Sequence, residues 1–207
     1  MIAIVDYGVG NLFSLKSSLS MIGAESVVTR SADDLRAAGK IILPGVGAFE
    51  DAAKKLSATG LDAVVTEQAR AGKPLLGICL GMQMLFERSF EYGEHKGLGL
   101  IPGAVVDMRP KIPPERKVPH IGWNALILKQ PAHPLFRYIK EGDCVYFVHR
   151  FYGVDCEQDT LATAEYGVEL TAAVGRKNVL GCQFHPEKSG RVGLNILHAF
   201  CEQEINT

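Results

Sequence analysis

The sequence predicts an α/β fold, in which a doubly wound, mostly parallel sheet is followed by an antiparallel extension in the second half. In the first half, short apolar runs alternate with stretches of helical period, which is typical of βαβ units around a parallel sheet. In the second half, the apolar runs are short and separated by turn residues. The length of 207 residues is that of one domain, so we expect residues 1–207 to form a single domain.

Four apolar runs in the first half predict parallel strands. They are Ile2–Val5, Ser26–Thr29, Lys40–Leu43 and Leu75–Ile78. Helices are expected between and after these runs. The first begins near Asn11 and keeps apolar residues at helical spacing up to Ile22. The second covers residues 49–71 with a break at Thr59-Gly60, and the third covers residues 82–86.

Five short apolar runs predict strands in the second half, at residues 105–108, 125–128, 145–148, 172–174 and 179–184. Five of the ten prolines lie between residues 102 and 119. We expect loop or sheet edge there, because proline cannot donate to a strand ladder. An amphipathic helix is expected from about Ser189 onward. Its apolar face would be formed by Val192, Ile196, Ala199 and Phe200.

Composition and charge exclude several classes of protein. With 47% hydrophobic and 22% charged residues, the chain is not a disordered one. No apolar run approaches the roughly 18 residues of a membrane span, and a net charge of −1 gives no basic footprint for nucleic acid. The cysteines are five, an odd number, and no basic region precedes Asp6. We therefore expect reduced thiols and a cytoplasmic protein.

The segment Gly77-Ile78-Cys79-Leu80-Gly81 is the strongest local motif. It follows an apolar run and precedes a helix, and its spacing is that of a nucleophile elbow with cysteine as the nucleophile. The glycines allow a sharp turn, and the start of a helix favours the reactive thiolate. The backbone N–H of Leu80 is then free to face an oxyanion. A buried structural cysteine is the alternative interpretation.

The segment Gln183-Phe184-His185-Pro186-Glu187 follows the last apolar run, at a strand end. Pro186 restricts His185 to an extended conformation, in which residues 185 and 187 point to the same side. Glu187 can therefore orient the imidazole as the third member of a triad. A surface turn is the alternative. Cys182 and His185 have the spacing of zinc ligands, but no second ligand pair is visible.

The segment Pro44-Gly45-Val46-Gly47 follows the third apolar run. A glycine-rich turn there can aim backbone N–H groups into the mouth of the sheet, although a plain turn is equally compatible with it. The segment lacks the lysine and hydroxyl of a phosphate loop, so nucleotide binding is weakly supported. All three segments come at the carboxyl ends of predicted strands, where ligands bind in open α/β sheets.

Together, these motifs resemble the class I (triad) glutamine amidotransferases over nearly the whole chain. Finer motifs are similar to one branch of that family, the glutaminase subunits that serve histidine biosynthesis. They are the segments at residues 6–11, 44–47, 77–83, 119–124 and 183–190. The segment Pro119-His120-Ile121-Gly122-Trp123-Asn124 is the most specific of them, because related amidotransferases do not normally carry it.

The resemblance implies a glutaminase that needs no cofactor and no metal. Cys79 would attack the side-chain amide of L-glutamine and form a γ-glutamyl thioester. His185 would protonate the leaving ammonia and then activate water, while Glu187 would hold His185.

The resemblance also implies how glutamine is bound. Leu80 N–H and the backbone of Gly45 and Val46 would form the oxyanion hole, after a rearrangement of one peptide that the glycines beside Val46 make sterically cheap. Gln83 and Glu91 match positions that hold the α-amino and α-carboxylate groups of glutamine. From the residues alone, a solvated helix face and the loop after it are the simpler interpretation.

A partner is implied as well. In the family branch, ammonia passes to a separate (βα)₈-barrel cyclase subunit in a heterodimer, and the cyclase makes imidazole glycerol phosphate and an aminoimidazole carboxamide ribotide. Trp123 would be an aromatic anchor of the interface, although from the residues alone a core tryptophan is equally compatible. The interface would include Asn11, Pro119, His120, Gly122, Trp123, Asn124 and Tyr146. Neither nucleic acid nor a membrane is expected as a partner.

The sequence departs from the family at Arg150, where a small hydroxyl residue usually follows the segment 146–149. In relatives the backbone at this point helps to bind glutamine, so Arg150 is a further candidate for glutamine binding. Its side chain could alter how the α-carboxylate is held, or it could turn outward, and both alternatives stay open.

Three other functions stay open. Other triad amidotransferases serve anthranilate, pyridoxal phosphate or purine synthesis, but the segment 119–124 and Val46 argue against them. A cysteine hydrolase acting on peptides or γ-glutamyl conjugates would share the elbow, but it would have no reason for a partner surface. A regulatory subunit that kept the fold would not need Cys79, His185 and Glu187 intact.

Overall fold

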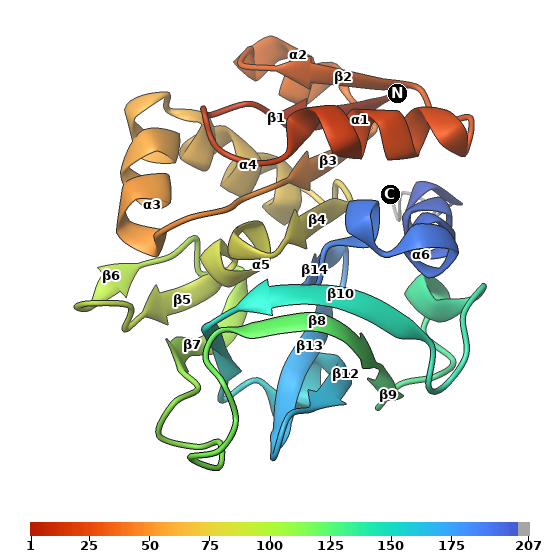
Figure 1. The fold of residues 1–207 in the computed structure, drawn as a ribbon. Coiled ribbons are helices and arrows are strands. Elements are labelled where there is room, and N and C mark those ends of the chain that lie inside the picture. The colour runs from red at the N-terminus through yellow and green to blue at the C-terminus, as the bar shows by residue number, and fades with distance from the viewer. Residues whose placement is uncertain (203–207) are drawn as a thin grey trace.

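The computed structural model describes residues 1–202 and has a large sheet with helices on both faces (Figure 1). Within these residues, that sheet has eight strands in the order β2-β1-β3-β4-β14-β13-β12-β9. Their bounds are β1 Ile2–Val5, β2 Ser26–Thr29, β3 Lys40–Leu43, β4 Leu75–Ile78, β9 Ile127–Leu128, β12 Thr160–Glu165, β13 Glu169–Arg176 and β14 Val179–Cys182. The four strands expected in the first half are confirmed with the bounds of their apolar runs.

Neighbouring strands on one side of this sheet are parallel. β1 pairs with β2 and β3, β3 pairs with β4, and β4 pairs with β14. β13, β12 and β9 continue the sheet in antiparallel pairing. The predicted fold class is therefore confirmed. The carboxyl ends of β1, β3, β4 and β14 lie along one edge, so the segments that follow these strands meet there.

Helices cover both faces of the sheet, because alternate residues of a strand point to opposite sides. Ile4 and Ile42 face α1 (Leu12–Met21) and α6 (Gly190–Glu202). Val5 and Ile41 face the helices of the other layer. That layer consists of α2 (Ala32–Ala37), α3 (Phe49–Ala58) and α4 (Leu61–Arg70). The helix break at Thr59-Gly60 is confirmed between α3 and α4.

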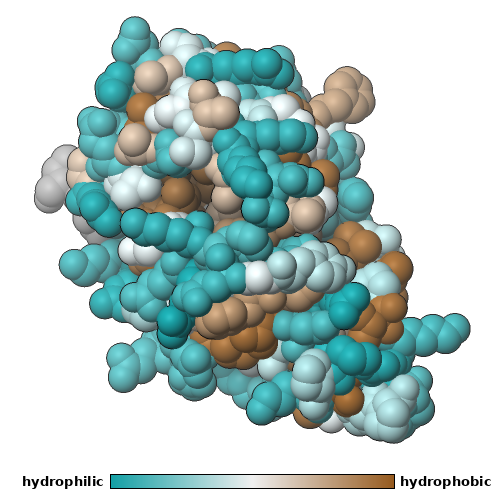
Figure 2. Space-filling view, turned by 90° about the vertical axis from the view of Figure 1, so that its left-hand side faces the viewer, coloured by the Kyte–Doolittle hydropathy of each residue, from teal (hydrophilic) through white to brown (hydrophobic). Residues whose placement is uncertain are grey.

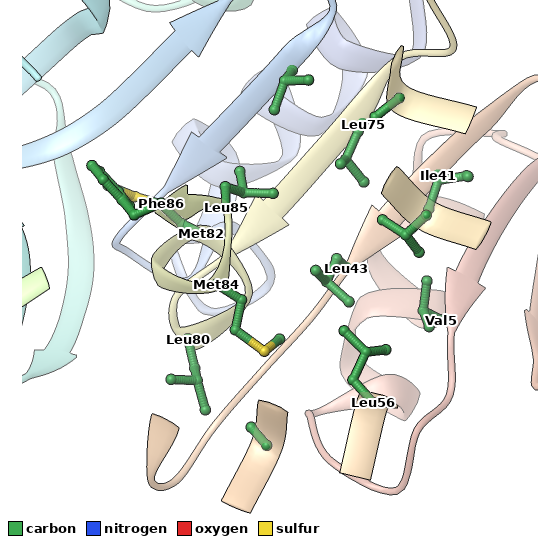
Figure 3. Close-up of a cluster of buried hydrophobic side chains, with 14 of the residues drawn as sticks. Val5, Ile41, Leu43, Leu56, Leu75, Leu80, Met82, Met84, Leu85 and Phe86 are labelled. Carbon is green, nitrogen blue, oxygen red and sulfur yellow. The ribbon is translucent and has the colours of Figure 1, made fainter. Parts of the chain in front are cut away.

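The short helix α5 (Leu80–Met84) packs into the second of these layers. Figure 3 shows Met84 reaching from α5 toward Leu43 of β3 and Leu56 of α3. The contact is apolar and fully buried, since all three side chains are at most 1% exposed. It fixes α5 beside the ends of β3 and β4.

Two smaller sheets complete the described chain. β8 (His120–Ala125) and β10 (Cys144–His149) form an antiparallel pair that lies at the front of Figure 1. The other sheet has the order β11-β7-β5-β6. Its strands are β5 (Phe86–Ser89), β6 (His95–Lys96), β7 (Ile101–Asp107) and β11 (Phe151–Val154). The 3-10 helices are η1 (Pro134–Phe136), η2 (Glu157–Asp159) and η3 (Pro186–Lys188).

Some boundaries differ from the sequence-based prediction. The helix expected at residues 82–86 begins at Leu80 and ends at Met84, and Phe86 begins β5 because it pairs with Ile101 of β7. The run expected at 125–128 is split, since Ala125 ends β8 and β9 follows the buried Leu126. α2, β5, β6, β8, β11 and β12 were not predicted.

The proline-rich stretch also holds a correction. Pro102 lies within β7, which is a central strand of the smaller sheet rather than an edge. It is tolerated because β11 pairs with β7 only at residues 104–107. On the other side, the register with β5 shifts between Phe86 and Arg88. The missing N–H of Pro102 therefore falls where the ladder is already interrupted.

The face that carries α3 and β6 is largely hydrophilic, with apolar side chains in separate patches (Figure 2). Apolar side chains also reach the right-hand edge of that view, which is the front of Figure 1, where β8 and β10 lie. Across residues 1–202, no helix combines the length and apolar character that crossing a membrane requires.

The substitution Gly81→Ala tests the close packing of α5. A Cβ at Gly81 would lie 1.8 Å from the Leu43 carbonyl oxygen, so strand or helix must shift. We expect the free energy of unfolding to fall by about 3 kcal/mol. Gly60→Ala is the control, because a Cβ there has φ +70° and no neighbour within 4 Å, leaving only backbone strain of about 1 kcal/mol. Urea unfolding measures both, and equal losses would contradict the packing argument.

Candidate active site

Cys79 occupies a sharp turn between β4 and α5. Its backbone has φ 54° and ψ −112°, a conformation that side chains rarely adopt, and its N–H donates to the Cys182 carbonyl oxygen at 2.7 Å. Gly77 and Gly81 make the turn possible, because a Cβ on Gly77 would lie 2.7 Å from the Gly81 carbonyl oxygen. The turn has the geometry of the elbow that the sequence predicts, and Cys79 is 7% exposed.

His185 and Glu187 form a buried pair after β14. His185 Nδ1 lies 2.8 Å from Glu187 Oε1, and both side chains are at most 3% exposed. The contact arises differently from the expectation of a fully extended chain. Only His185 is extended, and the 3-10 helix η3 then brings the carboxylate back to the ring. Within the described residues, His185 Nε2 has no hydrogen-bond partner, so this nitrogen is available for proton transfer.

The surroundings of His185 favour its charged form. Burial lowers the pKa of His185, but the neighbouring Cys79 and Glu187 outweigh burial and raise the pKa to about 9. Cys79 therefore lies within electrostatic reach of the imidazole. The charged imidazole can give a proton to a leaving group, and the thiolate is the form in which cysteine attacks a carbonyl carbon.

The Leu80 N–H is not free. It donates to the Gly45 carbonyl oxygen at 3.3 Å, so the expectation of a free N–H facing an oxyanion is wrong for this conformation. The reason is the close approach of the glycine-rich segment to α5, since a Cβ on Gly45 would lie 2.7 Å from the Gly81 nitrogen. Tyr7 holds the same segment, because its hydroxyl donates to the Pro44 carbonyl oxygen at 2.7 Å.

Gln83 is buried rather than on a solvated helix face. Its Nε2 donates to the Phe151 carbonyl oxygen at 2.9 Å and to Gln183 Oε1 at 3.0 Å. Gln183 Nε2 in turn lies 3.8 Å from Cys79 Sγ and donates to it. Sequence reasoning assigned no role to Gln183 or Phe151. The available signal was an amide side chain at a buried strand end, two residues before His185.

Glu91 is also buried, and its Oε2 accepts the N–H of Phe49, the first residue of α3, at 3.0 Å. Burial raises the pKa of Glu91, and Phe49 N–H, His95 and Arg150 counter part of that rise. The Arg150 side chain turns outward, where two of its nitrogens donate to Asp107 Oδ2 at 3.0 and 2.6 Å. Of the two alternatives for Arg150, the structure shows the outward one.

Four of the residues expected at a partner interface lie at or near the surface of the β8–β10 pair. Trp123 is 57% exposed, and its ring lies 6.2 Å from that of the half-buried Tyr146. Pro119 is exposed and Gly122 is half-buried. This strip of β8 and β10 is therefore accessible to another protein.

The other three expected interface residues are less accessible. His120 is 3% exposed, because strand alternation turns its ring inward, so the ring itself is not presented at the surface. Asn124 is half-buried and donates to the Glu165 carbonyl oxygen at 2.8 Å. Asn11 is half-buried and lines a small cavity together with the His185–Glu187 pair.

All five cysteines are free thiols. Cys182 is buried in β14, and burial raises its pKa. Among residues 1–202, no group of three or more histidine, cysteine, aspartate or glutamate side chains could hold a metal ion. Cys182 and His185 therefore have no further ligands around them.

The sequence matches the family described as "Glutamine amidotransferase class-I" over residues 3–203. The chain belongs to the class I glutamine amidotransferase family. A protein named "Imidazole glycerol phosphate synthase subunit HisH" from Caldanaerobacter subterraneus subsp. tengcongensis is 47% identical over 203 residues, covering 98% of each chain. A protein of the same name from Lacticaseibacillus casei is 50% identical over 204 residues, covering 98% of this chain and 95% of that one. Within the family, the chain therefore falls among the glutamine amidotransferase subunits of imidazole glycerol phosphate synthase.

Two solved structures share the fold. One, described as a glutamine amidotransferase, has a TM-score of 0.74 at 20% identity and covers 96% of this chain and 99% of that chain. PurLQS from Thermotoga maritima has a TM-score of 0.73 at 22% identity and covers 96% of each chain. At these identities, the likeness concerns the fold alone.

Removal of the Cys79 thiol should lower the pKa of His185. In Cys79→Ala, the opposing effect of burial remains and only Glu187 still favours the charged ring, so the pKa should fall well below about 9. An NMR titration of the histidine ring protons measures this. Cys201→Ala, which removes a thiol on α6, is the control and should leave the pKa of His185 in place. A value that stays near 9 in Cys79→Ala would refute the contribution of Cys79 to the pKa of His185.

Proposed function

We propose that this chain hydrolyses L-glutamine to glutamate and ammonia through Cys79, His185 and Glu187. The observation that carries the proposal is the arrangement of His185. Its Nδ1 lies 2.8 Å from Glu187 Oε1, and within residues 1–202 its Nε2 has no hydrogen-bond partner. Cys79 is close enough to raise the pKa of the ring. A nucleophile, a base and a group that orients the base are thus present together.

The reaction proceeds in two halves. The Cys79 thiolate attacks the side-chain carbonyl carbon of glutamine, and His185 Nε2 gives its proton to the leaving nitrogen as the C–N bond breaks. Ammonia departs and the γ-glutamyl group stays on Cys79 as a thioester. The neutral His185 then takes a proton from water, whose oxygen attacks the thioester. Glutamate leaves, and the thiolate and the charged imidazole are restored.

The oxyanion of each tetrahedral intermediate needs backbone donors that the present conformation does not offer. The Gly45 carbonyl oxygen accepts the Leu80 N–H at 3.3 Å. Rotation of the peptide between Gly45 and Val46 would remove this oxygen and bring the Val46 N–H in beside that of Leu80. Val46 is 40% exposed and Gly47 has φ +91°, so this stretch has room and backbone freedom to turn.

Glutamine would be held by residues next to this turn. Gln83 and Glu91 are buried near α5 and α3, and each keeps side-chain oxygen capacity beyond the contacts described above. The resemblance assigns them to the α-amino and α-carboxylate ends of glutamine. Their oxygens only accept, so they suit the α-ammonium group, whereas the α-carboxylate needs N–H donors from the neighbouring backbone. Arg150 would contribute through its backbone, because its side chain is paired with Asp107.

The ammonia would pass to a cyclase subunit in a heterodimer, with the chain acting as one amidotransferase domain in the cytoplasm. The names of the 47–50% identical relatives support a subunit of imidazole glycerol phosphate synthase. The outer strip with Trp123 and Tyr146, together with Pro119 and Gly122, is the surface we assign to this partner. Tyr146 would lie near the exit of the ammonia. Asn11, which lines the small cavity beside His185 and Glu187, would help to couple the two subunits.

Glutamate formation from glutamine tests the proposal. We expect slow turnover by the chain alone, because the Leu80 N–H is occupied, and a large rise when the cyclase subunit and its nucleotide ligand are added. Cys79→Ala should lower the stimulated rate by about 1,000-fold or more, whereas Cys144→Ala, an exposed thiol, should keep it.

Two results would contradict this function. Full turnover by the isolated chain would exclude activation by a partner. Stimulated turnover that survives in Cys79→Ala would exclude the thiol as nucleophile.

A further inference from the structure

The β8–β10 pair has two different faces. Its outer face carries Ile121 and Trp123, which are 58% and 57% exposed. Its inner face carries His120 and His149, which are register partners and are 3% and 5% exposed. Alternate residues of one strand share a backbone, so a protein that presses on the outer face also displaces the inner histidines.

A continuous chain of hydrogen bonds runs along the inner face. Asn124 Nδ2 lies 3.3 Å from His120 Nε2, and His120 Nδ1 lies 3.1 Å from His149 Nε2. His149 Nδ1 lies 2.9 Å from the Phe151 carbonyl oxygen. The chain therefore leads from β8, through β10, to the first residue of β11.

Packing holds the two rings in place. The His120 ring stacks against Phe147 and Tyr166, with centroid distances of 4.8 and 4.1 Å. Burial lowers the pKa of His120 to about 4, with help from Arg116, and lowers the pKa of His149 to about 3. Both rings are therefore neutral at pH 7, and each has one nitrogen that donates and one that accepts.

Only one placement of the protons satisfies all of these hydrogen bonds. The Phe151 carbonyl oxygen only accepts, so His149 carries its proton on Nδ1 and its Nε2 accepts from His120 Nδ1. At the other end, the Asn124 amide is oriented by the Glu165 carbonyl oxygen, which accepts from Nδ2, and by the following backbone N–H, which donates to Oδ1. The Phe151 carbonyl and the Asn124 amide therefore fix the same placement of the protons. Both histidines carry their proton on Nδ1.

The series of hydrogen bonds continues from Phe151 to the Cys79 thiol. The same carbonyl oxygen accepts from Gln83 Nε2, whose other hydrogen goes to Gln183 Oε1. Gln183 Nε2 is then left to face Cys79 Sγ at 3.8 Å. The direction of the Phe151 carbonyl thus decides which atoms the two glutamine side chains present to the site.

A second tie joins β10 to His185. Ser189 Oγ accepts the Tyr146 N–H at 2.9 Å and donates to the His185 carbonyl oxygen at 2.6 Å. The His185 N–H donates to the Tyr146 carbonyl oxygen at 2.9 Å. A displacement of β10 therefore moves the backbone of His185 as well as the hydrogen-bonded histidines of the inner face.

We propose that His120 and His149 are positioning residues that couple a protein bound on the outer face of β8–β10 to the orientation of Gln83 and Gln183 beside Cys79. The inference rests on the proposed glutaminase function and names the side chains through which a partner acts on that site. Displacement of β8 changes the His120–His149 contact, and the Phe151 carbonyl, which His149 holds, then turns relative to Gln83.

The tautomers test this coupling without an assay of activity. In the chain labelled with nitrogen-15 histidine, the rings of His120 and His149 should be protonated on Nδ1 and unprotonated on Nε2 at pH 7. Addition of the cyclase subunit should shift the resonances of both rings. The resonances of His133, a half-buried histidine at η1 that takes no part in these hydrogen bonds, should stay in place. An Nε2–H tautomer at either ring, or rings that do not respond to the partner, would overturn the proposal.

Kinetics of the complex provide the second test. His149→Asn and His120→Asn each remove a ring nitrogen from the chain, so the KM for glutamine should rise about tenfold, the effect of one net hydrogen bond, with a smaller change in kcat. The increase in kcat/KM caused by the cyclase should shrink in both variants, while His133→Asn should match the wild type.

The outcomes separate the coupling from the function itself. Unchanged KM and unchanged stimulation in a variant that keeps the wild-type unfolding temperature would overturn the coupling. A wild-type complex that makes no glutamate would refute the proposed function instead, and the tautomer spectrum would still decide the arrangement of the two histidines.

Discussion

The site depends on how closely α5 approaches the ends of β3 and β4. A Cβ on Gly81 would come within 1.8 Å of the Leu43 carbonyl oxygen, and one on Gly45 within 2.7 Å of the Gly81 nitrogen. This contact forces the sharp turn at Cys79 and places the thiol at the carboxyl edge of the sheet. Because β14 pairs with β4 in parallel, its end delivers His185 to the same edge. Without the glycine packing, the thiol, the imidazole and the glycine-rich segment would have no common meeting point.

Buried histidines serve two different purposes in this fold. Burial acts against the charge of His185, but Cys79 and Glu187 compensate and raise its pKa to about 9, so the ring can donate a proton. Burial lowers the pKa of His120 to about 4 and that of His149 to about 3, and for His149 the hydrogen bond to the Phe151 carbonyl counters only part of this effect. Those two rings stay neutral and transmit only the direction of hydrogen bonds. The presence or absence of neighbouring anions therefore separates proton transfer from positioning.

The parallel half of the fold could be predicted from periodicity, because each strand from β1 to β4 is a short apolar run that ends at a turn signal. The meeting of Cys79, His185 and the glycine-rich segment at one edge followed from the same pattern. The burial of Gln83 and Glu91 could not be predicted, because their partners, Phe151 and Phe49, are distant in the sequence. The inward direction of His120 likewise depends on the pairing of β8 with β10, which no local pattern specifies. The hydrogen bond from the Leu80 N–H to the Gly45 carbonyl oxygen depends on the backbone conformation of the glycine-rich segment. The identities of the side chains do not predict that conformation.

The most direct test of Cys79 as the nucleophile is the site at which an electrophilic analogue of glutamine labels the protein. Cys79 is only 7% exposed, whereas Cys144 is exposed, so a reagent guided by accessibility alone would select Cys144. A reagent guided by glutamine recognition and a reactive thiolate should instead modify Cys79, as peptide mass spectrometry of the labelled complex would show. We expect one modified cysteine, Cys79, with labelling slowed by excess glutamine. Labelling that falls on Cys144, or that glutamine does not slow, would contradict the assignment of Cys79 as the nucleophile.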